Sequence, residues 1–147
     1  MFEAEIHFNE LPFLVAEDSE DDLLLLERAL RKAGVRNPRV TTTTGQETID
    51  YLEHGLAFGN SDSFPVVLFL DLVMPKLDGM DVLEWLRDQS HPPLAIVLHT
   101  GVEDEDLLQK ARDLGASFYL PKGARPEAIR EVFRSAQAEW EQHHLMV

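Results

Sequence analysis

The sequence predicts an α/β fold in which five parallel strands form one doubly wound sheet flanked by five helices. Short apolar runs alternate along the chain with longer segments whose apolar residues recur at helical spacing, the pattern of successive βαβ units. The run 66–70 is apolar throughout, as expected for a strand that helices cover on both faces. We therefore expect this run to form the centre of the sheet.

Chain length and composition favour one domain with a substantial core. The chain has 147 residues, of which 44% are hydrophobic, and it contains no cysteine. Disulfide bonds and thiolate metal sites are therefore excluded. We expect a single domain over residues 1–147, with its core at about 11–140 and short extensions at both ends.

The charge balance excludes several kinds of partner. The chain carries 13 Lys and Arg against 27 Asp and Glu, a formal net charge of −14 at pH 7. Such a charge repels nucleic-acid phosphates and anionic membrane surfaces, so neither is an expected partner. The acidic N-terminal segment lacks the positive start of a signal peptide, and no apolar run reaches the length of a membrane span. A cytoplasmic location is predicted.

The first half of the chain supplies two strand–helix units. Ser19 is expected to cap the first helix and Gly34 to end it. Thr44 and Glu47 have capping-box spacing ahead of the second helix. The segment 57–65 is rich in Gly, Ser, Asn and Pro and is expected to form an exposed loop. The predicted elements are strands at 11–16 and 39–44 and helices at 19–34 and 47–56.

Three further units complete the predicted sheet. Asp78 is expected to cap the third helix, and Gly115 to lie just past the end of the fourth. Pro126 suits the first position of the last helix, whose apolar residues mark one face. The predicted elements are strands at 66–70, 94–99 and 117–120 and helices at 80–89, at 103–115 and from Pro126 onward.

Polar residues follow the predicted strands at their carboxyl ends, where open α/β sheets bind ligands. Glu17 and Asp18 follow the first strand, and Asp71 follows the third. Thr100 and Lys122 follow the fourth and fifth strands. Three carboxylates at one sheet edge repel one another and require a cation. Mg²⁺ suits such a site best, because it binds one or two carboxylates and keeps several waters.

These residue types together can support phosphoryl transfer. The Asp71 carboxylate can attack a phosphoryl group when a metal ion and the Lys122 ammonium neutralise charge on the transferring oxygens. The Thr100 hydroxyl can donate to one of those oxygens, and a lysine ammonium supplies compact positive charge. The set thus contains acids for a metal, an acid that attacks, a hydroxyl and a cation.

The chain resembles the receiver domains of two-component response regulators over nearly its whole length. The motifs FLVAEDSEDD, LFLDLVMPKLDG, IVLHTG and ASFYLPK carry the resemblance, in that order. It implies a flavodoxin-like fold with strand order 2-1-3-4-5. It also implies a phosphorelay signal receiver that is not an enzyme, apart from self-catalysed phosphoryl transfer and slow autodephosphorylation. The predicted elements leave no sequence for an output domain.

The same resemblance assigns residue roles. Asp71 matches the phosphoacceptor, which becomes 4-aspartylphosphate, and Glu17 and Asp18 match the acidic pair that binds Mg²⁺. The resemblance assigns the Val73 backbone carbonyl as a further metal ligand. It assigns Thr100 and Lys122 as the residues that contact the phosphate, and Thr100 and Tyr119 as switch residues.

Partners follow from a narrower resemblance. The first helix and the polar loop before the third strand are similar to those of single-domain regulators that serve bacterial phytochromes and related sensor kinases. This implies a sensor histidine kinase of the phytochrome type, and a histidine phosphotransfer protein as a second partner. The chain would compete for phosphoryl groups, relay them, or bind a target directly, and the sequence does not choose among these. The apolar last helix and the tail 143–147 favour a homodimer through the face of the fourth and fifth helices.

Three positions bear on how closely the chain follows the family pattern. Gly123 follows Lys122 where the family usually has a proline joined by a cis bond. A non-proline cis bond costs about 2.5–4 kcal/mol, so a trans bond is expected here. Glu17 replaces the usual aspartate, which lengthens the reach to a metal by one methylene and keeps the charge. Gly101 is small, as the family requires for access to the aspartate.

Two other functions remain as alternatives. A Mg²⁺-dependent phosphatase with an aspartyl nucleophile would need a general acid at position 73, which is a valine. A receiver-like binding module that is never phosphorylated is the second alternative. Among nearby polar residues, we interpret Glu20, Asp21 and Asp22 as helix-start charges outside the site. We interpret His99 as a partly buried strand-end residue rather than a catalytic one.

Overall fold

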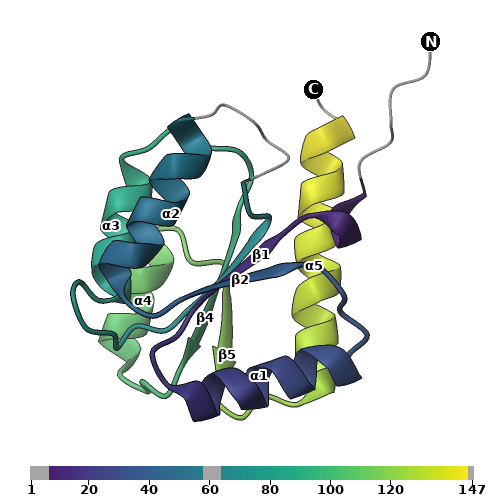
Figure 1. The fold of residues 1–147 in the computed structure, drawn as a ribbon, viewed down its shortest axis with the longest axis horizontal. Helices are drawn as coiled ribbons and strands as arrows, with labels where there is room; N and C mark the ends of the chain where they lie inside the picture. Colours follow the sequence, from purple (N-terminus) through teal and green to yellow (C-terminus); the bar gives the residue numbers. More distant parts are fainter. Residues whose placement is uncertain (1–6, 58–63, 146–147) are drawn as a thin grey trace.

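A computed structural model describes residues 7–57 and 64–145 of the chain. Five strands form one parallel sheet in the order β2-β1-β3-β4-β5, with β3 at its centre, which confirms the predicted fold class and strand order (Figure 1). The strands are β1 Phe13–Ala16, β2 Arg39–Thr42, β3 Val67–Leu70, β4 Ala95–Thr100 and β5 Phe118–Pro121. The helices are η1 Phe8–Glu10, a short 3₁₀ helix, and α1 Glu20–Lys32, α2 Gly45–Ala57, α3 Gly79–Arg87, α4 Glu105–Asp113 and α5 Pro126–Leu145.

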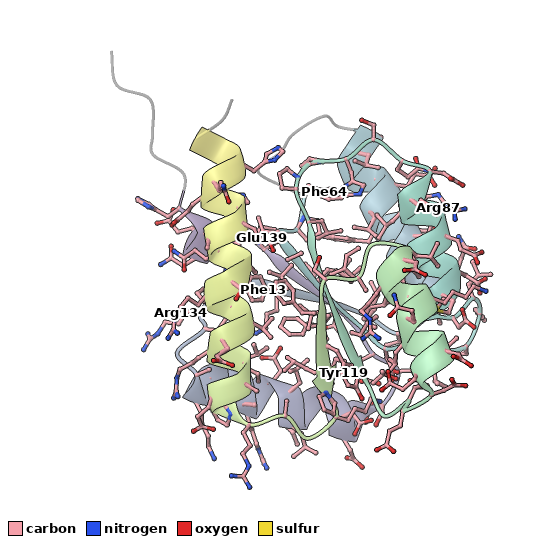
Figure 2. All side chains as sticks on the ribbon, turned by 180° about the vertical axis from the view of Figure 1, so that it is seen from behind. Phe13, Phe64, Arg87, Tyr119, Arg134 and Glu139 are labelled. Atoms are coloured by element: carbon pink, nitrogen blue, oxygen red, sulfur yellow. The ribbon has the colours of Figure 1, made fainter. Side chains whose placement is uncertain are left out.

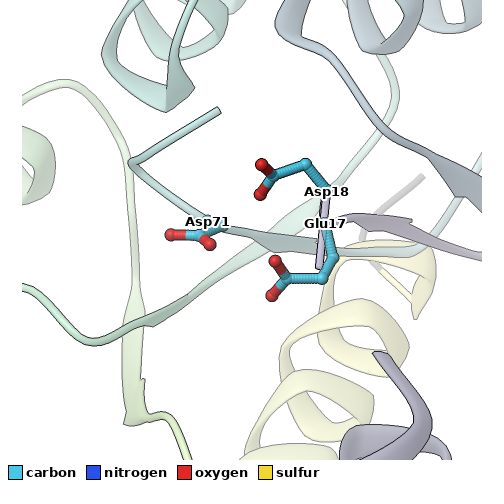
Figure 3. A group of neighbouring side chains, drawn as sticks. All are labelled: Glu17, Asp18 and Asp71. Carbon is cyan, nitrogen blue, oxygen red and sulfur yellow. The ribbon is translucent and has the colours of Figure 1, made fainter. Parts of the chain in front are cut away.

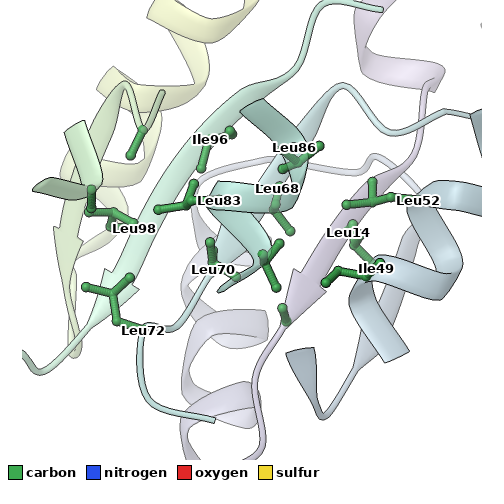
Figure 4. Packing of buried hydrophobic residues seen from close by; sticks show 14 of the residues in the cluster. Leu14, Ile49, Leu52, Leu68, Leu70, Leu72, Leu83, Leu86, Ile96 and Leu98 are labelled. Atoms are coloured by element: carbon green, nitrogen blue, oxygen red, sulfur yellow. The ribbon is translucent and has the colours of Figure 1, made fainter. Parts of the chain in front are cut away.

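Helices cover the sheet on both faces. α1 and α5 lie on one face, and α2, α3 and α4 lie on the other (Figure 1). Because successive strand residues point to opposite faces, the central strands β1, β3 and β4 each contribute to two buried clusters. Leu14, Leu68 and Leu98 pack with residues of α2, α3 and α4 (Figure 4). Phe13 and Val97 pack instead with residues of α1 and α5.

Side chains cap the helices at most of the predicted positions. The Ser19 hydroxyl accepts the backbone N–H of Asp22 at 3.2 Å. Asp78 and Asp81 form a reciprocal capping box at the start of α3. At the start of α2, however, the carboxylate of Glu47 accepts the N–H of Thr43 rather than that of Thr44, so the predicted box is only half formed.

Two features of the chain differ from the sequence-based expectation. The segment 57–65 was expected to be an exposed loop. Residues 58–63 lie outside the described residues, but Phe64 and Pro65 are buried, because the Phe64 ring joins the cluster beneath α2 and α3. The helix η1 was not expected. The amide of Asn37 donates to the carbonyls of Phe8 and Leu11 at 2.7 and 2.9 Å and holds this turn in place.

Within residues 7–57 and 64–145, no helix has the combination of length and apolarity needed to span a membrane. The longest of these helices, α5, has 20 residues and carries charged side chains such as Arg134 and Glu139 (Figure 2).

Candidate functional site

Three carboxylates meet at the carboxyl ends of β1 and β3 (Figure 3). One oxygen from each of Glu17, Asp18 and Asp71 lies within 4.8 Å of the others. Strand pairing explains this approach, because Ala16 lies opposite Leu70 and the residues that follow each of them are therefore neighbours. The backbone N–H of Asp71 also donates to the carbonyl of Ala16 at 3.2 Å. The parallel register thus places the acids together.

The acids differ in their exposure to water. The side chains of Glu17 and Asp71 are 1% and 3% exposed, whereas Asp18 is exposed. Burial raises the pKa of the Glu17 carboxyl to about 7, against a lowering effect of the backbone N–H of Ser19, which donates to it. Near neutral pH, Glu17 therefore changes its charge readily.

Lys122 supplies positive charge next to these acids. Its ammonium lies 2.6 Å from Oδ2 of Asp71 and 3.2 Å from Oε1 of Glu17. It also lies 2.6 Å from Oδ2 of Asp22, in the first turn of α1. The sequence predicts Asp22 to be a helix-start charge outside the site. The structure instead brings Asp22 into it through the lysine.

The position of Asp22 on α1 explains this contact. Leu26 and Leu30 are the buried residues of α1, and Asp22 precedes them by four and eight positions, on the same stripe of the helix. Lys122 follows Leu120, which packs in the α1 and α5 cluster, and alternation directs both side chains to that face. This helical spacing is the signal that could have identified Asp22 from the sequence.

The ammonium and its partners shift one another's pKa. The hydrogen bond from Lys122 is the main cause that lowers the pKa of the Asp22 carboxyl. Burial acts to lower the pKa of Lys122, but hydrogen bonds to Asp22 and Asp71 outweigh it and raise that pKa. Lys122 therefore stays charged in the folded protein at neutral pH.

Thr100 and Tyr119 meet at the loop after β4. Thr100 is fully buried, and its hydroxyl oxygen accepts the backbone N–H of Val102 at 3.3 Å. The hydroxyl of half-buried Tyr119 donates to the carbonyl of the same Val102 at 3.2 Å. Val102 therefore links the two side chains that the resemblance assigns to the switch.

His99 lies behind the acidic cluster. It is 4% exposed and therefore more buried than expected, and its Nδ1 lies 3.8 Å from Oε1 of Glu17. Burial and, next, the charge of Lys122 lower the pKa of His99, so its imidazole is neutral at pH 7. A pocket of about 130 Å³ adjoins it. The pocket is lined by Asp22, Leu25, Leu26, His99, Lys122, Gly123 and Ala124.

The loop after Asp71 is held by close backbone contacts. The N–H of Val73 donates to Oδ1 of Asp71 at 3.1 Å, and the Val73 side chain is exposed. A Cβ on Gly79 would lie 2.5 Å from the carbonyl oxygen of Asp71. Farther along, Leu77 has a positive φ of 72° and accepts the N–H of Gly45, which begins α2, at 3.0 Å. These contacts fix the backbone that carries Asp71.

The residues at this edge of the sheet fit a hard divalent cation. Three carboxylates stand against one ammonium, which leaves excess negative charge in a largely buried place. Oxygen ligands of this kind are those that Mg²⁺ prefers. Among the described residues, no peptide bond is cis, so the Lys122–Gly123 bond is trans, as expected. Gly123 has a φ of 86°, in the left-handed region that glycine tolerates best.

The comparisons with known proteins place most of the chain in one family. Residues 13–134 match the response regulator receiver domain. The DNA-binding transcriptional regulator NtrC of Klebsiella pneumoniae is 33% identical over 108 residues, which are 74% of this chain and 21% of NtrC. The chain thus spans about a fifth of the length of the NtrC proteins it matches. The probable methanogenesis regulatory protein FilR2 of Methanothrix harundinacea is 28% identical over 133 residues, 88% of this chain and 84% of FilR2.

Solved structures agree with this assignment. The bacteriophytochrome response regulator AtBRR superposes with a TM-score of 0.70 at 28% identity and covers 86% of this chain and 92% of its own. The response regulator RPA3017, described in red light signaling of R. palustris, has the same TM-score and identity and covers 84% and 92%. A signal receiver domain of a LuxO repressor protein from Vibrio parahaemolyticus has a TM-score of 0.78 at 20% identity, covers 93% and 97%, and supports the fold alone.

Proposed function

The chain belongs to the response regulator receiver domain family, and on this premise we propose that it accepts a phosphoryl group on Asp71. Receiver domains of response regulators transmit signals in two-component systems and are not classical enzymes. The observation that carries the proposal is the Lys122 ammonium, 2.6 Å from Asp71 and beside the three carboxylates. A nucleophile, a cation and a set of metal ligands thus lie within contact of one another.

Each residue has a defined part in the proposed transfer. A carboxylate oxygen of Asp71 attacks the phosphorus of a kinase phosphohistidine, and an O–P bond forms while the P–N bond breaks. The electron pair of that bond stays on the imidazole. The ammonium of Lys122 and the hydroxyl of Thr100 donate to the phosphoryl oxygens and stabilise their charge.

Mg²⁺ would be held by Glu17, Asp18, Asp71 and the backbone carbonyl of Val73, and it neutralises phosphoryl charge when bound. The excess of carboxylate over ammonium in the cluster supports this role. The exposure of Asp18 leaves a side of the cluster open to water, which Mg²⁺ retains in most protein sites.

The switch would run from Asp71 through Thr100 to Tyr119. Phosphorylation adds close to two negative charges at neutral pH, which attract the Thr100 hydroxyl and the Lys122 ammonium. A shift of Thr100 weakens its bond to the N–H of Val102, whose carbonyl is the present partner of Tyr119. Tyr119 would then change position, and the surface of α4, β5 and α5 would change with it.

We propose a sensor histidine kinase of the phytochrome type as the phosphoryl donor. Three structures similar to this chain at 26–28% identity are described as phytochrome or bacteriophytochrome response regulators. A histidine phosphotransfer protein is a further candidate partner. This receiver domain would act through contacts with other proteins.

A homodimer through the face of α4 and α5 belongs to the same proposal. Residues 146 and 147 of the tail 143–147 lie outside the described residues, so the proposed dimer contact is formed by α5 itself. Light scattering with and without beryllofluoride measures the mass directly. An unchanged monomer under both conditions would exclude this dimer.

Incubation with acetyl phosphate and Mg²⁺, followed by intact-mass measurement, tests the central proposal. Wild type should gain one phosphoryl group, and Asp71→Asn should gain none. Continued release of phosphate from a small ester would favour the phosphatase alternative instead. A wild-type protein that gains no phosphoryl group and does not respond to divalent ions would be a receiver-like binding module.

A further inference from the structure

The backbone N–H of Lys122 donates to the carbonyl of Thr100 at 3.2 Å, which sets the face on which the side chain starts, but the ammonium lies at the end of a flexible four-carbon stem. The next residue is glycine, the Lys122–Gly123 bond is trans, and Gly123 has a positive φ. Glycine itself adopts a wider range of backbone dihedrals than any other residue. Lys122 also lines the pocket of about 130 Å³, so neighbouring residues do not enclose it on every side. Contacts of the ammonium itself must therefore determine its position.

Of the three carboxylates around the ammonium, Asp22 is the one outside the candidate metal cluster. Glu17 and Asp71 each offer an oxygen to that cluster, and Asp22 does not belong to it. A metal ion and a phosphoryl group would compete with Lys122 for Glu17 and Asp71. The 2.6 Å contact to Asp22 does not face this competition.

Asp22 is itself held firmly. It lies in the first turn of α1, where its backbone N–H donates to Ser19 Oγ at 3.2 Å. Its side chain is 32% exposed and lies next to buried Leu26 on the same stripe of the helix. The anchor is thus a rigid helix terminus, whereas the segment that carries the lysine contains a glycine.

We propose that Asp22 is a positioning residue that holds the Lys122 ammonium beside Asp71 and so aims it at the incoming phosphoryl group. The contact takes over a task that a stiffer backbone after the lysine would otherwise perform. This inference rests on the proposed phosphoacceptor function for its consequence, but the contact itself exists without phosphorylation. Asp22 lies outside the carboxylate cluster, so it would neither bind the metal nor touch the phosphoryl group.

The test compares Asp22→Asn with Asp21→Asn, which removes the same charge from an exposed neighbour in the same turn. The first readout is the rate at which the Lys122 ammonium protons exchange with solvent. ¹⁵N NMR of the Mg²⁺-free protein measures this rate. Exchange should be slow in wild type and in Asp21→Asn and at least about tenfold faster in Asp22→Asn, as expected when a charge-assisted hydrogen bond is lost.

The second readout is the initial rate of phosphorylation by acetyl phosphate, measured beside Mg²⁺ affinity. Asp22→Asn should slow the reaction by about tenfold and leave Mg²⁺ affinity within about twofold, and Asp22→Glu should restore much of the rate. Equal behaviour of Asp22→Asn and Asp21→Asn in both readouts would overturn the inference, as would a loss of Mg²⁺ affinity that matches the loss of rate. If wild type is not phosphorylated at all, the proposed function fails, and the exchange measurement still decides whether Asp22 anchors the lysine.

Discussion

The ammonium of Lys122 and Oδ2 of Asp71 lie 2.6 Å apart, although they follow different strands with β4 between them. Asp71 is 3% exposed, so this pair compensates a carboxylate that has little access to water. The cost of burying a charge makes such a partner necessary in the absence of a metal.

Lys122→Met should therefore lower the stability of the metal-free protein by about 1–3 kcal/mol, because the buried carboxylates lose their cation. Mg²⁺ should bind about tenfold more tightly to the variant, because the ammonium no longer competes for the same oxygens. Urea unfolding and NMR titration with and without Mg²⁺ measure both effects. Unchanged Mg²⁺ affinity would show that the lysine and the metal do not share ligands.

Mg²⁺ affinity should depend on pH through Glu17. Burial raises the pKa of this carboxyl to about 7, so the folded protein holds a proton there at pH 6 that Mg²⁺ must displace. The apparent affinity should be about tenfold weaker at pH 6 than at pH 8. A titration of the Asp18 amide signal measures it. Glu17→Gln should bind more weakly and with little dependence on pH over this range, and a pH-dependent variant would assign the effect to another group.

Strand-end residues could be identified from the sequence because a parallel sheet places consecutive carboxyl ends at one edge. Asp71, Thr100 and Lys122 each follow a short apolar run, and the βαβ order then determines which strands are neighbours. Their convergence needed no knowledge of side-chain rotamers, only the positions of the apolar runs.

Contacts between a helix and a strand end were harder to predict. Three acids begin α1, and the helix dipole accounts for all of them equally. Of the three, only Asp22 lies on the same face of α1 as the buried Leu26 and Leu30. Its angular position around the helix axis therefore distinguishes it from Glu20 and Asp21. The buried turn at Phe8 was missed for a related reason, since a single aromatic residue has no periodicity.

The close contact of Gly79 with the Asp71 backbone gives a further prediction. A Cβ at position 79 would lie 2.5 Å from the Asp71 carbonyl oxygen, so Gly79→Ala must displace the backbone at Asp71. We expect a loss of about 1–3 kcal/mol in stability and slower phosphorylation. Gly55→Ala is the matched control. Gly55 lies in α2, and the only neighbour that its added Cβ would meet is the Phe64 side chain, at 3.4 Å. It should change stability by less than about 1 kcal/mol or increase it. Equal effects of the two variants would contradict the steric argument.

The ring of Phe8 should contribute to the stability of the domain although it precedes the first strand. Phe8 is 2% exposed. The centroid of its ring lies 5.2 Å from the ring centroid of Phe133 and 5.8 Å from that of Trp140, both on α5. Phe8→Ala should lower the free energy of unfolding by about 3–4 kcal/mol, because it opens a cavity between η1 and α5. Urea unfolding measures the loss, with Glu10→Ala, an exposed change in the same turn, as the control.

Phosphorylation distinguishes a local role of Phe8 from a wider one. Phe8 packs at the amino end of the sheet with β1 and α5, whereas Asp71 follows the carboxyl end of β3. The folded fraction of Phe8→Ala should therefore gain a phosphoryl group at nearly the wild-type rate. A stability loss below about 1 kcal/mol would mean that η1 is not part of the cooperative core. A slower reaction in fully folded Phe8→Ala would instead show that the packing of α5 affects the position of Lys122 through β5.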